Sequence, residues 1–222
     1  MSSPFSGKNE GFLNGVGRGK DSVVMALRAD PDNWVVKFNH DCEGDMFALT
    51  KYLKRKYEIL QAFIPQHIPK SHFVLGNKDD GDSRKTKAYT VQQRIHGLKI
   101  GELSPEQIED ERFIRNLHSL VRGLHIMHTT VSQLNEGLDP YAQVDTILDL
   151  GGLSKQARIT DTVDLYDLTD SIRNSPNIMV DPESLQLYCV DFGRGYWNEE
   201  KEETFNRLME IANPSESMVD ES

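Results

Sequence analysis

The sequence predicts an α+β protein in which a small antiparallel sheet with one helix is followed by a mainly helical part. Short apolar segments separated by turn residues run from Phe12 to Phe38, which is typical of antiparallel strands. Apolar residues then recur at intervals of three and four in residues 45–63 and 105–127, as in amphipathic helices. With 222 residues, 37% of them hydrophobic, the chain is long enough for one compact unit or for two small lobes that share a cleft.

The balance of charge excludes some classes of partner. Lys and Arg total 25 and Asp and Glu total 35, giving a net charge of −10, so we expect no general attraction to nucleic acid or to an anionic membrane. No apolar run reaches the length of a membrane span and Met1–Pro4 opens no signal peptide, so a cytoplasmic location is expected. Cys42 and Cys189 lie far apart without metal-ligand spacing, and both are expected to be reduced thiols, one of them in a buried strand.

Composition distinguishes the two ends of the chain. Residues 1–11 are polar and rich in Gly and Ser, and they are expected to form a flexible N-terminus. Residues 213–222 are polar and acidic and are expected to form a tail.

Local signals predict several element boundaries. A strand is expected to begin at Phe73 and to end in a polar, solvated loop at Gly76–Lys87, because that stretch is rich in charge. Ser104 and Gln107 have the spacing of a capping box, so a helix is expected to start there and to continue to Met127.

The most informative stretch of the chain is residues 176–193. It contains two short apolar segments joined by turn residues, which predicts a hairpin with Asn177 at one end and Asp191 at the other. Amide and carboxylate oxygens are hard ligands, and Mg²⁺ takes few protein ligands together with phosphate oxygens. The sequence therefore predicts a magnesium site formed by Asn177 and Asp191.

The same residues carry a resemblance to a known family. N-I-M-V-D from Asn177, followed by C-V-D-F-G from Cys189, resembles the catalytic-loop Asn and the D-F-G metal site of the protein-kinase-like phosphotransferases, especially the branch that holds aminoglycoside and choline kinases. The resemblance implies a two-lobed fold with a small antiparallel N-lobe sheet and a shortened, mainly helical C-lobe. The N-lobe would comprise residues 12–96 and the C-lobe residues 97–212, with an insertion at 129–170. It also implies that ATP and Mg²⁺ are the cofactors.

The resemblance extends to the first strands of the chain. Gly15 and Gly17 lie in a Gly-rich stretch that would cover phosphates, although the third glycine of the family's G-x-G-x-x-G pattern falls at Lys20. A tight turn that binds no ligand is the alternative. Lys37, in the strand W-V-V-K-F, corresponds to the lysine that holds the α- and β-phosphates, and a solvent-facing strand lysine is the alternative.

The partners of this lysine and of the adenine are also implied. An acid on the helix at 45–63 or just before it would pair with Lys37, and both Glu58 and Glu43 are candidates. Residues around Gln93 resemble the hinge, whose backbone groups would bind the adenine, while an ordinary edge strand with a turn fits the same residues.

The catalytic loop departs from the family pattern. The base is expected five residues before Asn177, where this chain has Ile172. Asp170 is the nearest acid, and either a longer loop lets it accept the proton of the acceptor hydroxyl or it only caps a helix. His125 and His128 have a spacing compatible with a shared metal, but no third ligand completes a site, so they are interpreted as helix-surface histidines.

The resemblance implies a function and one principal alternative. We expect an ATP- and Mg²⁺-dependent phosphotransferase that acts on a hydroxyl of a small molecule or of the protein itself, because neither A-P-E nor a long activation segment follows Gly193. The alternative is a pseudokinase that binds nucleotide or a protein partner without transferring phosphate. A structural α+β protein with a coincidental D-F-G is the third interpretation.

Overall fold

The computed structural model describes residues 12–18, 22–39, 45–79, 84–134, 173, 175, 177–191 and 206. These residues divide into two compact units, each considered by itself. The first contains the described residues up to Arg55 and those of Pro69–Arg94, and the second contains Lys56–Ile68 and those from Ile95 onwards. No helix among the described residues combines the length and the apolar character needed to cross a membrane.

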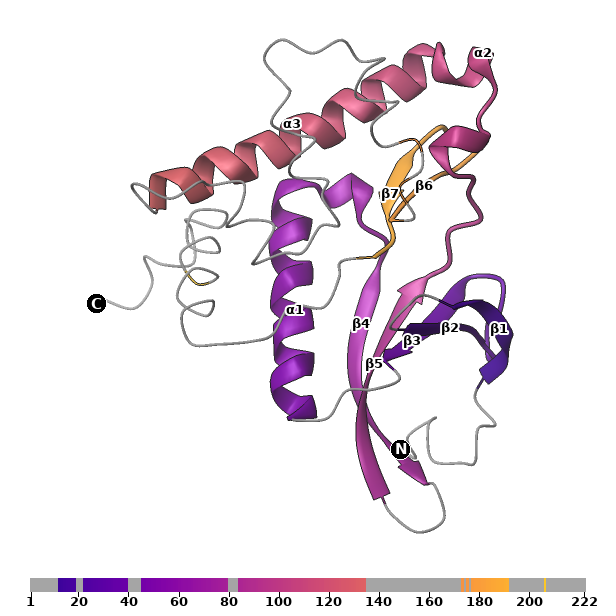
Figure 1. Cartoon of the computed structure of the whole chain (residues 1–222), viewed down its shortest axis with the longest axis vertical. Helices are drawn as coiled ribbons and strands as arrows, with labels where there is room; N and C mark the ends of the chain where they lie inside the picture. The colour runs from indigo at the N-terminus through magenta and orange to yellow at the C-terminus, as the bar shows by residue number, and fades with distance from the viewer. Residues whose placement is uncertain are drawn as a thin grey trace. The chain divides into compact units, whose positions relative to one another are not determined.

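The protein is α+β, with a five-stranded antiparallel sheet in its first unit (Figure 1). The strand order is β1-β2-β3-β5-β4. A turn at Asp30–Asn33 joins the second and third strands, where the Asn33 side chain donates to Asp30 Oδ1 at 2.9 Å. The bounds are β1 (Phe12–Arg18), β2 (Ser22–Leu27), β3 (Trp34–Asn39), β4 (Ser71–Asp79) and β5 (Arg84–Gln93).

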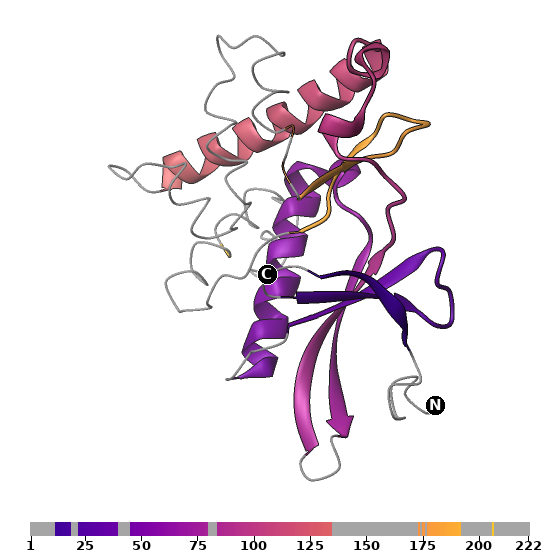
Figure 2. The ribbon, with the colours of Figure 1, turned by 45° about the vertical axis from the view of Figure 1, so that its right-hand side comes forward.

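The predicted loop at Gly76–Lys87 is wrong for most of its residues. β4 continues to Asp79 and β5 begins at Arg84, and nine consecutive residue pairs join them, from Ser71 opposite Gln92 to Asp79 opposite Arg84. β3 pairs with β5 only from Tyr89 onwards, so the rest of this hairpin continues as a two-stranded ribbon (Figure 2). Pairing between the two strands determines the structure here, although the local composition is that of a loop.

The boundary between the two units falls within α1 (Met46–Phe63), so the end of this helix is the first helical segment of the second unit. Asp45 caps the start of this helix by accepting from the backbone of Phe47 at 2.8 Å. The other bounds are η1 (Pro65–His67), η2 (Ile100–Glu102), α2 (Pro105–Ile108) and α3 (Glu111–Leu134).

The capping box at Ser104 and Gln107 is confirmed, since each side chain accepts from the other's backbone N–H. The helix it starts is only one turn long, however, because Asp110 caps a new helix by accepting from the backbone of Arg112 at 2.8 Å. That helix, α3, extends to Leu134, beyond the predicted start of the insertion at residue 129.

The predicted hairpin is confirmed as β6 (Ile178–Val180) paired with β7 (Leu187–Cys189). Ile178, Val180, Leu187 and Cys189 share one face of the hairpin and are fully buried. One buried stripe of α3 belongs to the same core, which contains Phe113, Leu117, Leu120, Leu124 and Met127. Cys189 is a free thiol in a buried strand, as expected.

Candidate functional site

The open end of the β6–β7 hairpin carries the two predicted metal ligands. The backbone N–H of Val190 donates to the carbonyl of Asn177 at 2.8 Å, so the pairing of the strands extends to this end. Asn177 is half-buried, and Asp191, the residue after Val190, is exposed. The register therefore brings an amide and a carboxylate to the same end of one hairpin.

Three-residue strands are too short to hold this geometry alone. The outer edge of β6 is paired, because the N–H and the C=O of Val180 both bond to Leu98 at 2.8 Å. Gly97 lies directly against this strand, where a Cβ would come within 2.7 Å of the Val180 carbonyl oxygen. The backbone of residues 97–98 thus acts as a third strand beside β6.

The closed end of the hairpin has an ordered turn. Asp181 Oδ1 accepts from the backbone of Ser184 at 2.8 Å and from that of Glu183 at 3.0 Å, and these bonds lower the pKa of Asp181. Leu185 has φ 56°, in the left-handed region, although its side chain is buried. The surrounding contacts hold this conformation against its local cost.

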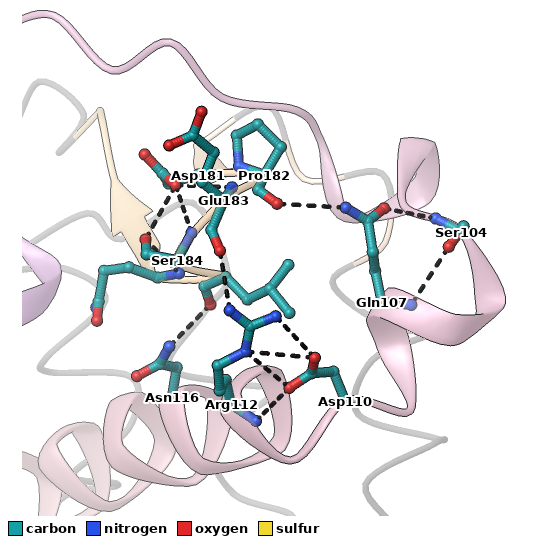
Figure 3. Close-up of polar contacts among 11 residues, drawn as sticks. Ser104, Gln107, Asp110, Arg112, Asn116, Asp181, Pro182, Glu183 and Ser184 are labelled. Carbon is teal, nitrogen blue, oxygen red and sulfur yellow. Dashed lines mark hydrogen bonds and ion pairs between the residues drawn. The ribbon is translucent and has the colours of Figure 1, made fainter.

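Side chains of two helices fix this turn by binding its backbone carbonyls (Figure 3). Asn116 of α3 donates to the carbonyl of Leu185 at 2.9 Å, and Arg112 Nη1 donates to that of Glu183 at 3.0 Å. Arg112 is itself oriented by Asp110, whose pKa falls to about 2 beside the guanidinium. Gln107 of α2 reaches the Pro182 carbonyl at 3.5 Å.

His67 holds the remaining edge and was not identified from the sequence. It is fully buried, and its Nδ1 lies 2.9 Å from the carbonyl oxygen of Leu187 in β7. Burial lowers the pKa of His67 more than this hydrogen bond raises it, so the ring is neutral near neutral pH. Lys56 of α1 is also fully buried, and no sequence signal distinguished it from its lysine neighbours.

In the first unit, the register aligns one predicted glycine with the predicted lysine. Gly17 is opposite Val24, and Val24 is opposite Lys37, so the three occupy one row across β1, β2 and β3. Gly15 is opposite Met25, and the pairing is irregular on both sides of it. A Cβ at Gly15 would meet nothing within 4 Å, so the space beside that glycine is open.

The predicted hinge residue Gln93 ends β5 opposite Trp34. Its backbone N–H donates to the Lys70 carbonyl at 2.8 Å, and the N–H of Arg94 donates to that of Asn33 at 2.7 Å. Both N–H groups are therefore occupied within the first unit. An adenine would have to use other backbone groups, or the side chain of Gln93.

The remaining predicted residues are separated or lie outside the described part of the chain. Glu58 is half-buried on α1 and belongs to the second unit, whereas Lys37 belongs to the first, so their ion pair stays a prediction. Asp170 and Glu43 lie outside the described residues, as does Cys42. Within the described ranges, no group of three or more His, Cys, Asp or Glu side chains is arranged to hold a metal ion.

Comparison with known proteins adds no assignment, since neither a protein-family model nor a curated protein matches the chain.

Proposed function

We propose that this protein is an ATP- and Mg²⁺-dependent phosphotransferase of protein-kinase-like fold. It would transfer a phosphoryl group to a hydroxyl of a small molecule or of the protein itself. The observation that carries the proposal is the β6–β7 hairpin, whose register brings Asn177 and Asp191 to the same end. A purely structural hairpin has no need of two oxygen ligands at that end.

The donor set fits the metal. Mg²⁺ prefers oxygen ligands and keeps most of its coordination for water and substrate phosphates, so one amide and one carboxylate are a sufficient protein contribution. Bound there, Mg²⁺ would neutralise charge on the phosphate oxygens during transfer. At the closed end of the hairpin, the Asp181 carboxylate and the backbone carbonyls of Glu183 and Leu185 are engaged in holding the turn, which favours the open end as the ligand end.

The first unit supports the nucleotide half of the proposal. The strand that carries Lys37 is followed directly by α1, the order that the family resemblance requires of the lysine strand and its helix. Gly17 is in the same row of the sheet as Lys37. Gly17 has no side chain, so its backbone and the ammonium group of Lys37 belong to the same face of the sheet. In the proposed roles, Gly15 and Gly17 cover the phosphates, and Lys37 binds them and pairs with Glu58.

The acceptor side of the reaction rests on Asp170 as the residue that orients the hydroxyl. Phosphoryl transfer depends mainly on positioning and electrostatic stabilisation, so a base two residues farther from Asn177 than usual is compatible with activity. Asp170→Asn should therefore lower turnover while leaving metal-dependent nucleotide binding intact.

A thermal-shift titration with ATP, in the presence and absence of Mg²⁺, tests the binding step, and release of γ-phosphate on the same sample tests turnover. We expect a metal-dependent rise in Tm that is absent in Asp191→Ala and in Lys37→Ala. Glu183→Ala is the matched control, because it removes an exposed carboxylate from the other end of the same hairpin. That variant should respond to ATP and Mg²⁺ as the wild type does.

The outcomes separate the candidate functions. A metal-dependent rise without any phosphate release would support the pseudokinase alternative, a regulatory module that binds nucleotide. An equal rise in Asp191→Ala would refute the assigned metal site. No rise in the wild-type protein would refute both nucleotide-binding functions.

A further inference from the structure

The two outer edges of the β6–β7 hairpin are held in different ways. Hydrogen bonds join Asn177 to Val190 and Asp181 to Gln186, so by the alternation of antiparallel pairs Val180 and Leu187 direct their backbone groups outwards. On β6, backbone groups of Leu98 satisfy Val180. On β7, the outward carbonyl is that of Leu187, which is fully buried.

A buried carbonyl needs a donor, and side chains of η1 and of the hairpin's own turn are both within reach of this one. His67 Nδ1 lies 2.9 Å from the Leu187 oxygen, and the side-chain nitrogen of Gln186 lies 3.1 Å from it. The same Gln186 nitrogen donates to the Gln66 carbonyl at 3.0 Å and also lies 3.0 Å from His67 Nδ1. β7 is therefore anchored from outside by side chains of its surroundings and of its own turn.

The protonation of the imidazole follows from these partners. The Leu187 carbonyl oxygen only accepts, and the two protons of the Gln186 nitrogen can be met by the carbonyls of Gln66 and Leu187, so we place the proton of the neutral ring on Nδ1. Nε2 is then an acceptor, and the Gln66 side-chain nitrogen lies 3.4 Å from it. Because the ring has no exposed surface, nothing in bulk solvent competes for either nitrogen.

The two edges of the hairpin depend on different groups. The bonds between Val180 and Leu98 are made by backbone groups on both sides, so neither of these two side chains takes part in them. On β7, the bond made by η1 depends on the identity of residue 67. Asp191 lies four residues beyond Leu187, about 13 Å along an extended chain, so a shift of β7 moves Asp191 relative to Asn177.

We propose that His67 is a positioning residue for the metal site, and that its hydrogen bond to Leu187 sets where Asp191 stands relative to Asn177. This role rests on the proposed function, since it presupposes that the two residues bind Mg²⁺ with a nucleotide. His67 itself touches neither the metal nor the substrate. It acts through the backbone of β7.

The test compares His67→Asn with His67→Leu. An asparagine amide can donate from near the Nδ1 position, whereas leucine fills the space without donating. The apparent Kd for Mn²⁺, used as a probe for Mg²⁺, is measured by isothermal titration at saturating ATP, and ATP binding without metal is measured beside it. We expect His67→Leu to weaken metal binding by about 10- to 100-fold. This is the effect typical of losing a residue that orients a metal ligand without contacting the metal.

His67→Asn should recover most of the lost metal affinity, and ATP binding without metal should be unchanged in both variants. If His67→Leu does not fold, His67→Gln takes its place, since its amide lies near Nε2 and misses the Leu187 carbonyl. Equal metal affinity in all variants, with only a lower Tm, would overturn the positioning role and leave the proposed function standing. Absence of metal binding in the wild type would overturn both.

Discussion

Substitution of Gly123 by alanine sets two effects of known size against each other. Gly123 lies in the interior of α3 and is buried. Alanine is favoured over glycine within a helix by about 1 kcal/mol, so propensity alone predicts a more stable protein. The contacts of the site predict the opposite, because α3 lies closely against the end of α1 at this position.

The size of the steric effect follows from the distances. A Cβ on Gly123 would lie 2.6 Å from the carbonyl oxygen of Phe63, and nearer still to Cγ2 of Ile64. Close carbon–oxygen contacts are about 3.3–3.6 Å, so about 0.7–1.0 Å is missing. Because the oxygen belongs to the backbone, the helices must separate, and the upper half of the usual overpacking cost applies, about 2–3 kcal/mol.

The net expectation for Gly123→Ala is a loss of about 1–2 kcal/mol in the free energy of unfolding. In a chain of this length that lowers the Tm by about 2–8 °C. Calorimetry and urea denaturation measure the two quantities. His118→Ala, at an exposed position of the same helix, is the control and should be neutral or slightly stabilising. A Gly123→Ala protein more stable than the wild type would refute the close approach of the two helices.

Three further predictions concern buried groups of the second unit. Burial raises the pKa of Cys189 to about 12, so iodoacetamide should leave this thiol unlabelled until the protein is unfolded, as peptide mass spectrometry will show. Labelling in the folded protein would contradict its burial. Asn116→Asp replaces the donor to the Leu185 carbonyl with an acceptor and should cost about 1–3 kcal/mol in urea denaturation, whereas an unchanged midpoint would show that this bond does not stabilise the turn. The pKa of His67 is lowered from 6.5, so below that pH the unfolded chain binds a proton that the folded protein does not. The free energy of unfolding should therefore fall as the pH falls below about 6.5, with a smaller fall in His67→Asn.

The parts of the fold that the sequence predicted correctly are those specified by neighbouring residues. The β6–β7 hairpin follows from two apolar segments and turn residues beginning at Asp181, and the capping box follows from Ser104 and Gln107. Asn177 and Asp191 could be assigned to one end of the hairpin because the length of the turn and the alternation of apolar residues, both of them local, predict its register.

Two parts of the structure were missed for different reasons. The hydrogen-bond partner of His67, Leu187, is 120 residues away, so no local pattern marks His67 as an anchor. The long pairing of β4 with β5 was interpreted as a loop at Gly76–Lys87, because charge density indicates solvent exposure but not whether the backbone is paired.

The anchors of the hairpin turn have a consequence for which positions can vary. Gln107, Arg112 and Asn116 all bind main-chain oxygens, so they recognise the path of the turn and not the identity of its side chains. The exposed side chains of Pro182 and Glu183 are then free to change, provided that the backbone keeps its course. The constraint on sequence falls instead on the helices. We therefore expect amino-acid substitutions to be tolerated in the turn and not at the three helix residues that donate hydrogen bonds to it.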